Sequence, residues 1–247
     1  MNVKNTTKRR SKSISKAIMS MLLILGFVPI VIMAINSYII NIDTLRERND
    51  LAKQSAVATI QKARTDLNKT TNDKLTEVSR QPIFENDFDF KQIRRDLQLT
   101  ISGDDSYTNV IFINQNGKFT SAKGIKDTAD LRTKDWYKGA IQKEGQIYWA
   151  TPHYLEATGK WMTTASTVVR NKKGDSGVIC FDISYDGIIN EFADMKVGRT
   201  GSLTLVSNTG NVINSTGNEN AGTVYKIGKN ISQSPEFKAI ANSKKRK

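Results

Sequence analysis

Four side chains in the middle of the sequence have the chemical types that a pocket for a small charged metabolite needs. Lys134 is a cation, Trp136 and Tyr137 follow it closely, and Asp182 lies inside the apolar run 178–183. A small polar ligand requires a cation for its anionic end, a carboxylate for its cationic end, and flat apolar walls that exclude water. Because a buried acid is costly unless it is paired, Asp182 is the strongest candidate. Core packing for the two aromatics and a solvated position for Lys134 are the alternatives.

The inventory of reactive residues argues against an enzyme. The chain has one histidine, His153, and one cysteine, Cys180. A zinc cluster needs several such ligands, and a Ser-His-Asp or Cys-His arrangement would depend on His153 alone. We therefore predict no catalytic residue, no cofactor and no metal site. We expect His153 to be structural or to lie at a pocket rim, and the thiol of Cys180 to be buried in a strand.

The formal net charge of +13 does not indicate a nucleic-acid partner. Six cations lie in the first 16 residues and four more in the last four, which leaves +3 for the rest of the chain. A nucleic-acid binder gathers Lys and Arg on one folded face with aromatic side chains between them. We predict no nucleic-acid partner.

Residues 17–42 contain no charged side chain and follow a basic segment, residues 1–16, that contains no acid. About 20 apolar residues in a helix cross a hydrocarbon core of about 30 Å, so the length fits a transmembrane helix. The cations predict a cytoplasmic N-terminus and an extracellular main domain in the cell membrane, single-pass in this sequence. A cleaved signal peptide is the main alternative, but its apolar region is about 7 to 15 residues long and ends in small residues. A buried core helix is a weaker alternative.

Residues 43–80 predict a long extracellular helix, since they contain no Gly or Pro. Apolar residues recur along it at spacings close to three, four or seven, namely Leu45, Ala52, Ala56, Ile60, Ala63, Leu67, Leu75 and Val78. Such a stripe must be covered, by a domain or by the same helix of a second subunit. We expect a homodimer through this helix; a solvated linker is the alternative. Pro82 marks the end of the helix.

Residues 81–187 predict one α+β module of an ordinary size for a single core. We expect helices within 83–106 and 130–143, a hairpin over 110–121, and strands at 146–151, 161–170 and 177–183. Together they predict an antiparallel sheet with helices on one side. The pattern restarts after residue 187, with a helix at 188–195, a hairpin over 202–214 and a helix at 234–241. Residues 188–247 therefore predict a second module that is incomplete.

The order of these elements, together with four local strings, resembles the double Cache (dCache) sensor domain of methyl-accepting chemotaxis proteins, the bacterial chemoreceptors. The strings lie at 130–140, 151–160, 177–184 and 198–210. The first, DLRTKDWYKGA, is similar to the family's DxRxRxWYxxA segment, which lines the membrane-distal pocket. The resemblance implies a PAS-like, membrane-distal Cache module at 81–187 and the start of a membrane-proximal one at 188–247.

The resemblance also implies which residues bind a ligand. Trp136, Tyr137, Tyr154 and Asp182 match the family's amino-acid-binding pattern, whereas Lys134 stands in place of its Arg and Ala129 in place of a Tyr. Lysine keeps the positive charge but loses the bidentate fork that holds a carboxylate in one orientation. We expect a small charged metabolite, either an amino acid or another one.

In such receptors a second transmembrane helix and a signalling region follow the sensor, and this sequence contains neither. We therefore expect the sensing part of a chemoreceptor, truncated before its signalling region. The sensor half of a histidine kinase or a nucleotide cyclase is an alternative, because both use such domains. A membrane-anchored adhesion or structural domain without a ligand is the alternative from another class, and it would scatter the pocket residues instead of gathering them.

Overall fold

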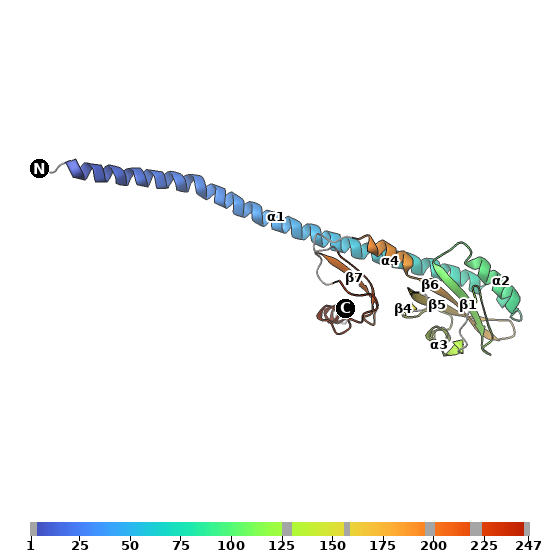
Figure 1. The fold of residues 1–247 in the computed structure, drawn as a ribbon. Helices are drawn as coiled ribbons and strands as arrows, with labels where there is room; N and C mark the ends of the chain where they lie inside the picture. The colour runs from blue at the N-terminus through green and yellow to red at the C-terminus, as the bar shows by residue number, and fades with distance from the viewer. Residues whose placement is uncertain (1–3, 125–129, 156–158, 196–200, 218–223, 245–247) are drawn as a thin grey trace. The chain divides into compact units, whose positions relative to one another are not determined.

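The computed structural model of the chain describes residues 4–124, 130–155, 159–195, 201–217 and 224–244 (Figure 1). The chain divides into two compact units, residues 1–54 and 55–247. One helix, α1 (Lys4–Ser79), begins in the first unit and ends in the second. Ala129 and residues 198–200, the start of the predicted string at 198–210, lie outside the described residues.

In the first unit, α1 exposes a long apolar segment. An 18-residue window within residues 16–79 has a mean hydropathy of 2.8, and none of it is buried. Leu25 and Met33, for example, are 71% and 72% exposed. By length and composition, this is the one helix among the described residues that could cross a membrane. The predicted helix over 17–42 is confirmed, and its crossing of a membrane stays a prediction.

In the second unit, the end of α1 packs into an apolar core. Leu75 and Val78 are buried, as the predicted apolar stripe requires, whereas Leu45 at the other end of that stripe is exposed. The helix ends at Ser79, and a 3-10 turn, η1 (Pro82–Phe84), follows. Proline lacks the N–H that a continuing helix needs, so the predicted end of the helix is confirmed.

The next helix, α2 (Phe90–Thr100), has a well-formed N-terminal cap. The side chain of Asp89 accepts hydrogen bonds from two backbone N–H groups of the first turn, at 2.9 and 3.2 Å. These bonds hold the pKa of Asp89 below its ordinary value. Ile93 and Leu97, one turn apart, are fully buried, which confirms the predicted helical spacing.

Among the described residues, six antiparallel strands form the main sheet of the second unit. They are β1 (Tyr107–Asn114), β2 (Phe119–Ser121), β3 (Tyr148–Trp149), β4 (His153–Leu155), β5 (Lys160–Arg170) and β6 (Ser176–Ser184). Their order is β2-β1-β6-β5-β3, and β4 pairs with the first residues of β5. The predicted hairpin and the two long strands are confirmed. The sequence pattern does not predict β4, because Pro152 separates it from the strand before it.

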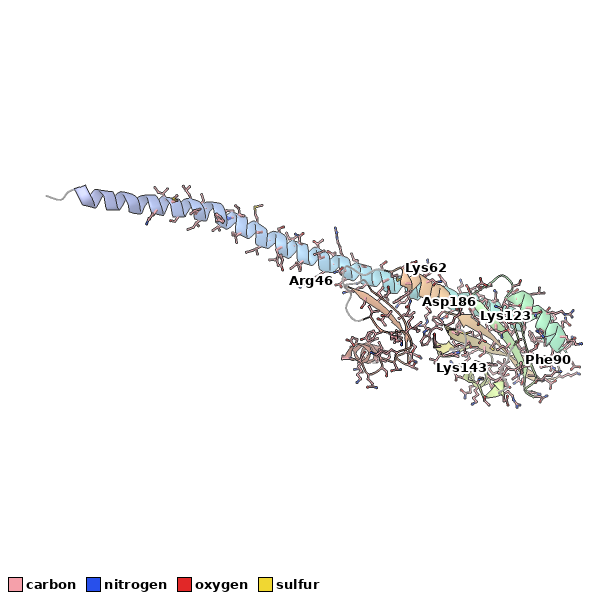
Figure 2. The ribbon with its side chains drawn as sticks, viewed as in Figure 1. Arg46, Lys62, Phe90, Lys123, Lys143 and Asp186 are labelled. Atoms are coloured by element: carbon pink, nitrogen blue, oxygen red, sulfur yellow. The ribbon has the colours of Figure 1, made fainter. Side chains whose placement is uncertain are left out.

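One face of this sheet packs against α1 and α2. Phe112 on β1 is fully buried there and meets three aromatic rings. Its ring centroid lies 5.3 Å from that of Phe84, 4.9 Å from that of Phe88, and 5.6 Å from that of Phe90. Phe90, labelled in Figure 2, is the first residue of α2. Tilted and edge-on arrangements at these distances are favourable, so this cluster fixes α2 on the sheet.

The opposite face packs against α3 (Asp135–Gln142), which follows the 3-10 turn η2 (Leu131–Thr133). Val178 and Cys180 on β6 form a second buried cluster there with Ala140 of α3. The prediction of helices on one side of the sheet is therefore wrong. A central strand that is covered on both faces is apolar at successive positions, and the run 178–183 has this character. The expected burial of Cys180 is confirmed.

The described residues of the last part of the second unit form four smaller elements. They are α4 (Asp186–Ala193), β7 (Ser202–Val206), β8 (Val212–Gly217) and α5 (Pro235–Lys244). β7 and β8 form a two-stranded antiparallel sheet, which confirms the second predicted hairpin. α4 packs beside β8, where the side-chain amide of Asn214 donates to the carbonyl of Ile189 at 3.5 Å.

Candidate functional site

Asp182 lies near the end of β6, in the middle of the sheet. It pairs with Thr164 on β5 and with Asn109 on β1. The hydroxyl of Thr164 donates to Oδ1 of Asp182 at 2.7 Å. The Asn109 side chain is engaged elsewhere, because its oxygen accepts from the backbone N–H of Lys123 at 3.0 Å. Among the described residues, Thr164 is thus the one donor that we find to this carboxylate.

Asp182 is the one partly buried residue within the otherwise buried run 177–184. Phe181 and Ile183, its neighbours, are fully buried and face α1 and α2, whereas Asp182 is partly buried and shares its face with Cys180. Burial raises the pKa of Asp182, and the hydrogen bond from Thr164 and the nearby His153 only partly offset this rise. A cation placed beside Asp182 would therefore be stabilised.

Helix α3 forms an aromatic wall on the same face of the sheet. Trp136 and Tyr137 are partly buried against the cluster that contains Val178 and Cys180, and their ring centroids lie 6.1 Å apart. The hydroxyl of Ser166 on β5 donates to the carbonyl of Trp136 at 2.8 Å, which ties the helix to the strand. Burial raises the pKa of the Tyr137 hydroxyl. Both aromatics therefore share the sheet face of Asp182.

Lys134 occupies the N-cap position of α3, two residues before Trp136. It is partly buried, its backbone is extended, and its carbonyl accepts from the N–H of Lys138 at 3.2 Å. The capping position fixes the start of the helix, so the Lys134 backbone and the aromatic wall are held as one piece. Four of the five predicted contact residues, Lys134, Trp136, Tyr137 and Asp182, therefore belong to the elements of this sheet face.

Tyr154, the fifth predicted contact residue, lies apart from these four. It pairs across β4 and β5 with Trp161, and the two ring centroids are 5.8 Å apart. Successive side chains in a strand point to opposite faces, and Trp161 lies three residues from Thr164. The Tyr154 and Trp161 pair is consequently on the face opposite Asp182.

Two polar residues of the Asp182 face are not among the five predicted contact residues: Thr164 was not predicted at all, and His153 was expected to be structural or to lie at a pocket rim. Thr164 bonds Asp182 directly, and His153 is close enough to lower its pKa. The alternation within 161–170 is the signal that could have found Thr164, since it predicts which residues of that strand share a face. His153 required the pairing of β4 with β5, which no sequence pattern supplied.

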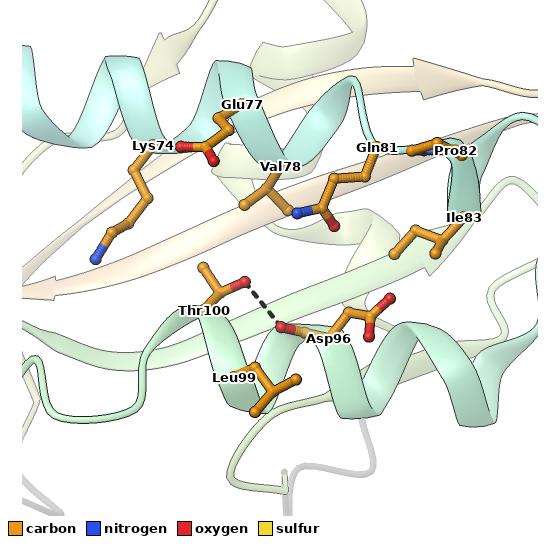
Figure 3. A pocket seen from close by; sticks show the side chains of 9 residues that line it. All are labelled: Lys74, Glu77, Val78, Gln81, Pro82, Ile83, Asp96, Leu99 and Thr100. Carbon is orange, nitrogen blue, oxygen red and sulfur yellow. Dashed lines mark hydrogen bonds between the residues drawn. The ribbon is translucent and has the colours of Figure 1, made fainter.

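A cavity of about 520 Å³ lies elsewhere, between the end of α1, η1 and α2 (Figure 3). Glu77 and Asp96 point toward it from the two helices, and Val78, Ile83 and Leu99 supply apolar lining. Its helices cover the sheet face opposite Asp182. The cavity therefore belongs to the helical layer and is separate from the candidate site.

Comparison with solved structures finds sensor domains of bacterial chemoreceptors. The ligand-binding domain of the Campylobacter jejuni chemoreceptor Tlp3, in complex with L-norvaline, matches with a TM-score of 0.54 and 19% identity over 70% of this chain and 69% of that one. The ligand-binding domain of the Pseudomonas aeruginosa amino acid chemoreceptor PctC, in complex with GABA, matches with a TM-score of 0.54 and 18% identity over 77% of this chain and 80% of that one. At these identities the likeness shows the fold.

Comparison with curated proteins finds methyl-accepting chemotaxis proteins. TlpA of Bacillus subtilis is 26% identical over 225 residues, which is 90% of this chain and 33% of the relative. TlpB of the same organism is 33% identical over 88 residues, which is 36% of this chain and 12% of the relative. The chain thus spans about a third of the length of TlpA. The profile of dCache_1, described as a Cache domain, matches residues 5–246, and the chain therefore belongs to this family of sensor domains, as the sequence resemblance predicted.

Proposed function

We propose that the second unit is the ligand-binding part of an extracellular sensor, and that the sheet face around Asp182 binds a small metabolite carrying an ammonium group. The observation that carries this proposal is the partly buried carboxylate of Asp182, which receives one hydroxyl hydrogen bond, from Thr164. Because burial disfavours its charged form, this carboxylate gains most from a cationic partner. The ammonium group of a ligand would supply that partner.

The ligands named for the solved relatives support an amino-acid-like molecule. L-norvaline and GABA, named with the Tlp3 and PctC domains, each combine an ammonium group with a carboxylate at neutral pH. In this chain Lys134 would serve the carboxylate, and Trp136 and Tyr137 would form the wall that excludes water. Since lysine offers a point charge instead of a planar fork, we expect looser orientation of the carboxylate than an arginine would give.

Exchanging Lys134 tests this assignment. With L-norvaline, L-isoleucine and GABA as probes, Lys134→Ala should weaken binding by about tenfold, which corresponds to about 1.4 kcal/mol for one lost charge-assisted contact. Lys134→Arg should strengthen it, because the guanidinium fork binds a carboxylate with two parallel hydrogen bonds. Titration calorimetry on the full chain in lipid nanodiscs measures both effects. Equal affinity in all three proteins would remove Lys134 from the site, and no binding of any probe would favour the adhesion alternative.

We also propose that residues 17–42 anchor the chain in the cell membrane with residues 1–16 in the cytoplasm. The uncharged, exposed apolar segment of α1 and the cations before it support this. A tag at the N-terminus should resist external protease in intact cells, whereas a cleavage site inserted beside Ser121 should be cut. The reverse pattern would contradict an extracellular sensor.

Within this proposal, residues 43–80 form a stalk that pairs with the same helix of a second copy of the chain. Residues 81–187 form the membrane-distal module, and residues 188–247 form the beginning of a membrane-proximal module. The relative TlpA, whose match covers 90% of this chain, is a methyl-accepting chemotaxis protein. This supports chemotaxis as the output over the output of a histidine kinase or a nucleotide cyclase. The dCache_1 family supports a sensing role over an enzymatic one.

A further inference from the structure

Two cations stand two residues apart in the segment that leads into α3, and they have different surroundings. Arg132 lies in η2, and Lys134 is the N-cap residue of α3. By chemistry alone, a guanidinium group is the better partner for a carboxylate, because its fork donates two parallel hydrogen bonds. The contacts of Arg132 decide whether that fork is available to a ligand.

The fork of Arg132 is occupied by the protein itself. Its Nη2 donates to Oδ2 of Asp130 at 2.7 Å, and its Nε lies 3.0 and 3.1 Å from the two carboxylate oxygens of the same residue. Its Nη1 donates to the backbone carbonyl of Gln115 at 3.1 Å. The bonds from Arg132 lower the pKa of Asp130 to about 2, so the pair stays ionised at neutral pH. Arg132 is therefore not the cation that a ligand carboxylate would meet.

The carbonyl that Arg132 binds belongs to a turn that is tied to the main sheet. Residues 114–118 connect β1 to β2, and Gly117 has a φ of 84° there, which favours glycine. A Cβ atom at Gly117 would lie 3.2 Å from Cζ of Arg132, so the guanidinium group packs directly against the turn. The N–H of Gln115 donates to the carbonyl of Ser176 at 3.0 Å, and its side-chain oxygen accepts from the N–H of Ser176 at 3.1 Å. The turn is thus held to the first residue of β6.

On its other side, Arg132 is continuous with the residues of the candidate site. Leu131 is buried in the same cluster as the aromatic wall, and its carbonyl accepts from the N–H of Lys134 at 3.2 Å. The side chain of Asp130 caps η2 by accepting from the N–H of Arg132 at 3.0 Å. The guanidinium group is also close enough to Tyr137 to act on the pKa of its hydroxyl. A displacement of η2 would therefore move Lys134 and the aromatic wall together.

We propose that Arg132 is a positioning residue of the ligand site, and that its guanidinium group fastens the segment 130–137 to the turn between β1 and β2. This rests on the proposed function, and it adds a residue that acts on the ligand only through Lys134 and the aromatic wall. Side chains that bind a ligand need neighbours that fix their positions. Arg132 provides this by joining η2 to a carbonyl 17 residues earlier in the chain.

Arg132→Gln and Arg132→Lys test the proposal, with Arg170→Lys as the matched control. Arg170 also bonds one carboxylate, that of Glu144, and one turn carbonyl, that of Gly174, but it does so beyond the C-terminal end of α3. Its side chain is 52% exposed, similar to the 41% of Arg132. The control therefore removes the same kind of tie at a place that carries no predicted contact residue.

Binding to the full chain in lipid nanodiscs, with L-norvaline, L-isoleucine and GABA as probes, is the first measurement. Arg132→Gln should bind the best probe about tenfold more weakly than the unmodified chain, because charge-assisted hydrogen bonds are lost. Arg132→Lys should lie between these two proteins, since one ammonium group cannot bond both partners in the geometry of a fork. Arg170→Lys should bind within about twofold of the unmodified chain, because exposed ion pairs contribute little.

Fluorine NMR separates positioning from a general loss of stability and needs no ligand. The chain has three tryptophans, and after labelling with fluorotryptophan the variant Trp136→Phe identifies the signal of Trp136. Arg132→Gln should shift or broaden this signal and leave that of Trp161 on β5 unchanged. Arg170→Lys should change neither signal.

Unchanged affinity in Arg132→Gln, or an unchanged Trp136 signal, would overturn the proposal. An equal loss of affinity in Arg132→Lys and Arg170→Lys would also overturn it, because any tie on α3 would then have the same effect. If no probe binds the unmodified chain, or if Asp182→Asn binds like it, the proposed function fails and the positioning role fails with it. If Asp182→Asn loses binding and Arg132→Gln does not, only the assignment of Arg132 fails.

Discussion

Asp182→Asn is expected to abolish the rise in melting temperature that an amino-acid-like ligand causes. The asparagine side chain keeps an oxygen that accepts from Thr164 but has no negative charge for an ammonium group. A ligand at a hundredfold excess over its Kd stabilises a protein by about 2.7 kcal/mol, and this stabilisation should disappear. Differential scanning fluorimetry with and without L-isoleucine measures it.

The same variant should be more stable than the unmodified chain when no ligand is present. Burial raises the pKa of Asp182, so the ionised carboxylate costs stability at neutral pH. Below the raised pKa the native state takes up the proton before the unfolded chain does, and the cost then vanishes. The gain from Asp182→Asn, about 0.5–2 kcal/mol as for other single stabilising substitutions, should therefore be largest near pH 7. It should shrink as the pH falls toward the ordinary pKa of a carboxyl group.

Asp186→Asn is the control for both effects. Asp186 forms an ion pair with Lys160 in the first turn of α4, and its side chain is exposed (Figure 2). Its replacement should leave ligand binding unchanged. Loss of binding in this variant, or full binding in Asp182→Asn, would contradict the assignment of the carboxylate.

Phe112→Ala is expected to lower the free energy of unfolding of the second unit by about 3–5 kcal/mol, the usual range for a buried Phe in a core. Phe112 is fully buried, and three aromatic rings surround it, so neighbouring backbone cannot easily fill the space that the ring leaves. Urea unfolding followed by fluorescence measures the change, because all three tryptophans lie in this unit.

Phe119→Ala is the matched control for the core variant. Phe119 lies on the neighbouring strand β2, opposite Ile113, but is 37% exposed. Its loss should cost about 1 kcal/mol or less. Equal effects of the two substitutions would show that the aromatic cluster does not hold α2 on the sheet.

Local patterns in the sequence were sufficient for most single elements of the fold. The end of α1 at Ser79, the helical spacing of Ile93 and Leu97, and the hairpin of β1 and β2 follow from periodicity and turn residues, which act over a few positions. The placement of α3 could not be predicted in this way. The face of the sheet that α3 covers depends on which strands are neighbours. β6 lies between β5, which directly precedes it in the sequence, and β1, which is far from it in the sequence.

In the candidate site, too, local sequence patterns predict some residues, whereas others depend on how the strands pair. Asp182 stands out in the sequence because an acid interrupts an apolar run, and Trp136 and Tyr137 stand out because a known segment surrounds them. Whether His153 or Tyr154 faces Asp182 depends on a ladder register, and a shift of one residue exchanges the two. Two adjacent residues of suitable chemistry therefore could not be separated without the pairing of β4 and β5.

Because Cys180 is buried, the rate at which its thiol is modified can report how often the sheet opens. Burial raises the pKa of this thiol well above its ordinary value, and a thiol attacks reagents only as the thiolate. Modification must then wait until β6 is transiently released from its neighbours, so its rate reports how often that happens. Since Cys180 is the chain's single cysteine, a thiol reagent reports on the opening around β6 alone. A molecule bound at Asp182, two residues from Cys180 on the same face, would lower the rate of Cys180 modification. Its binding could therefore be detected without a label on the ligand.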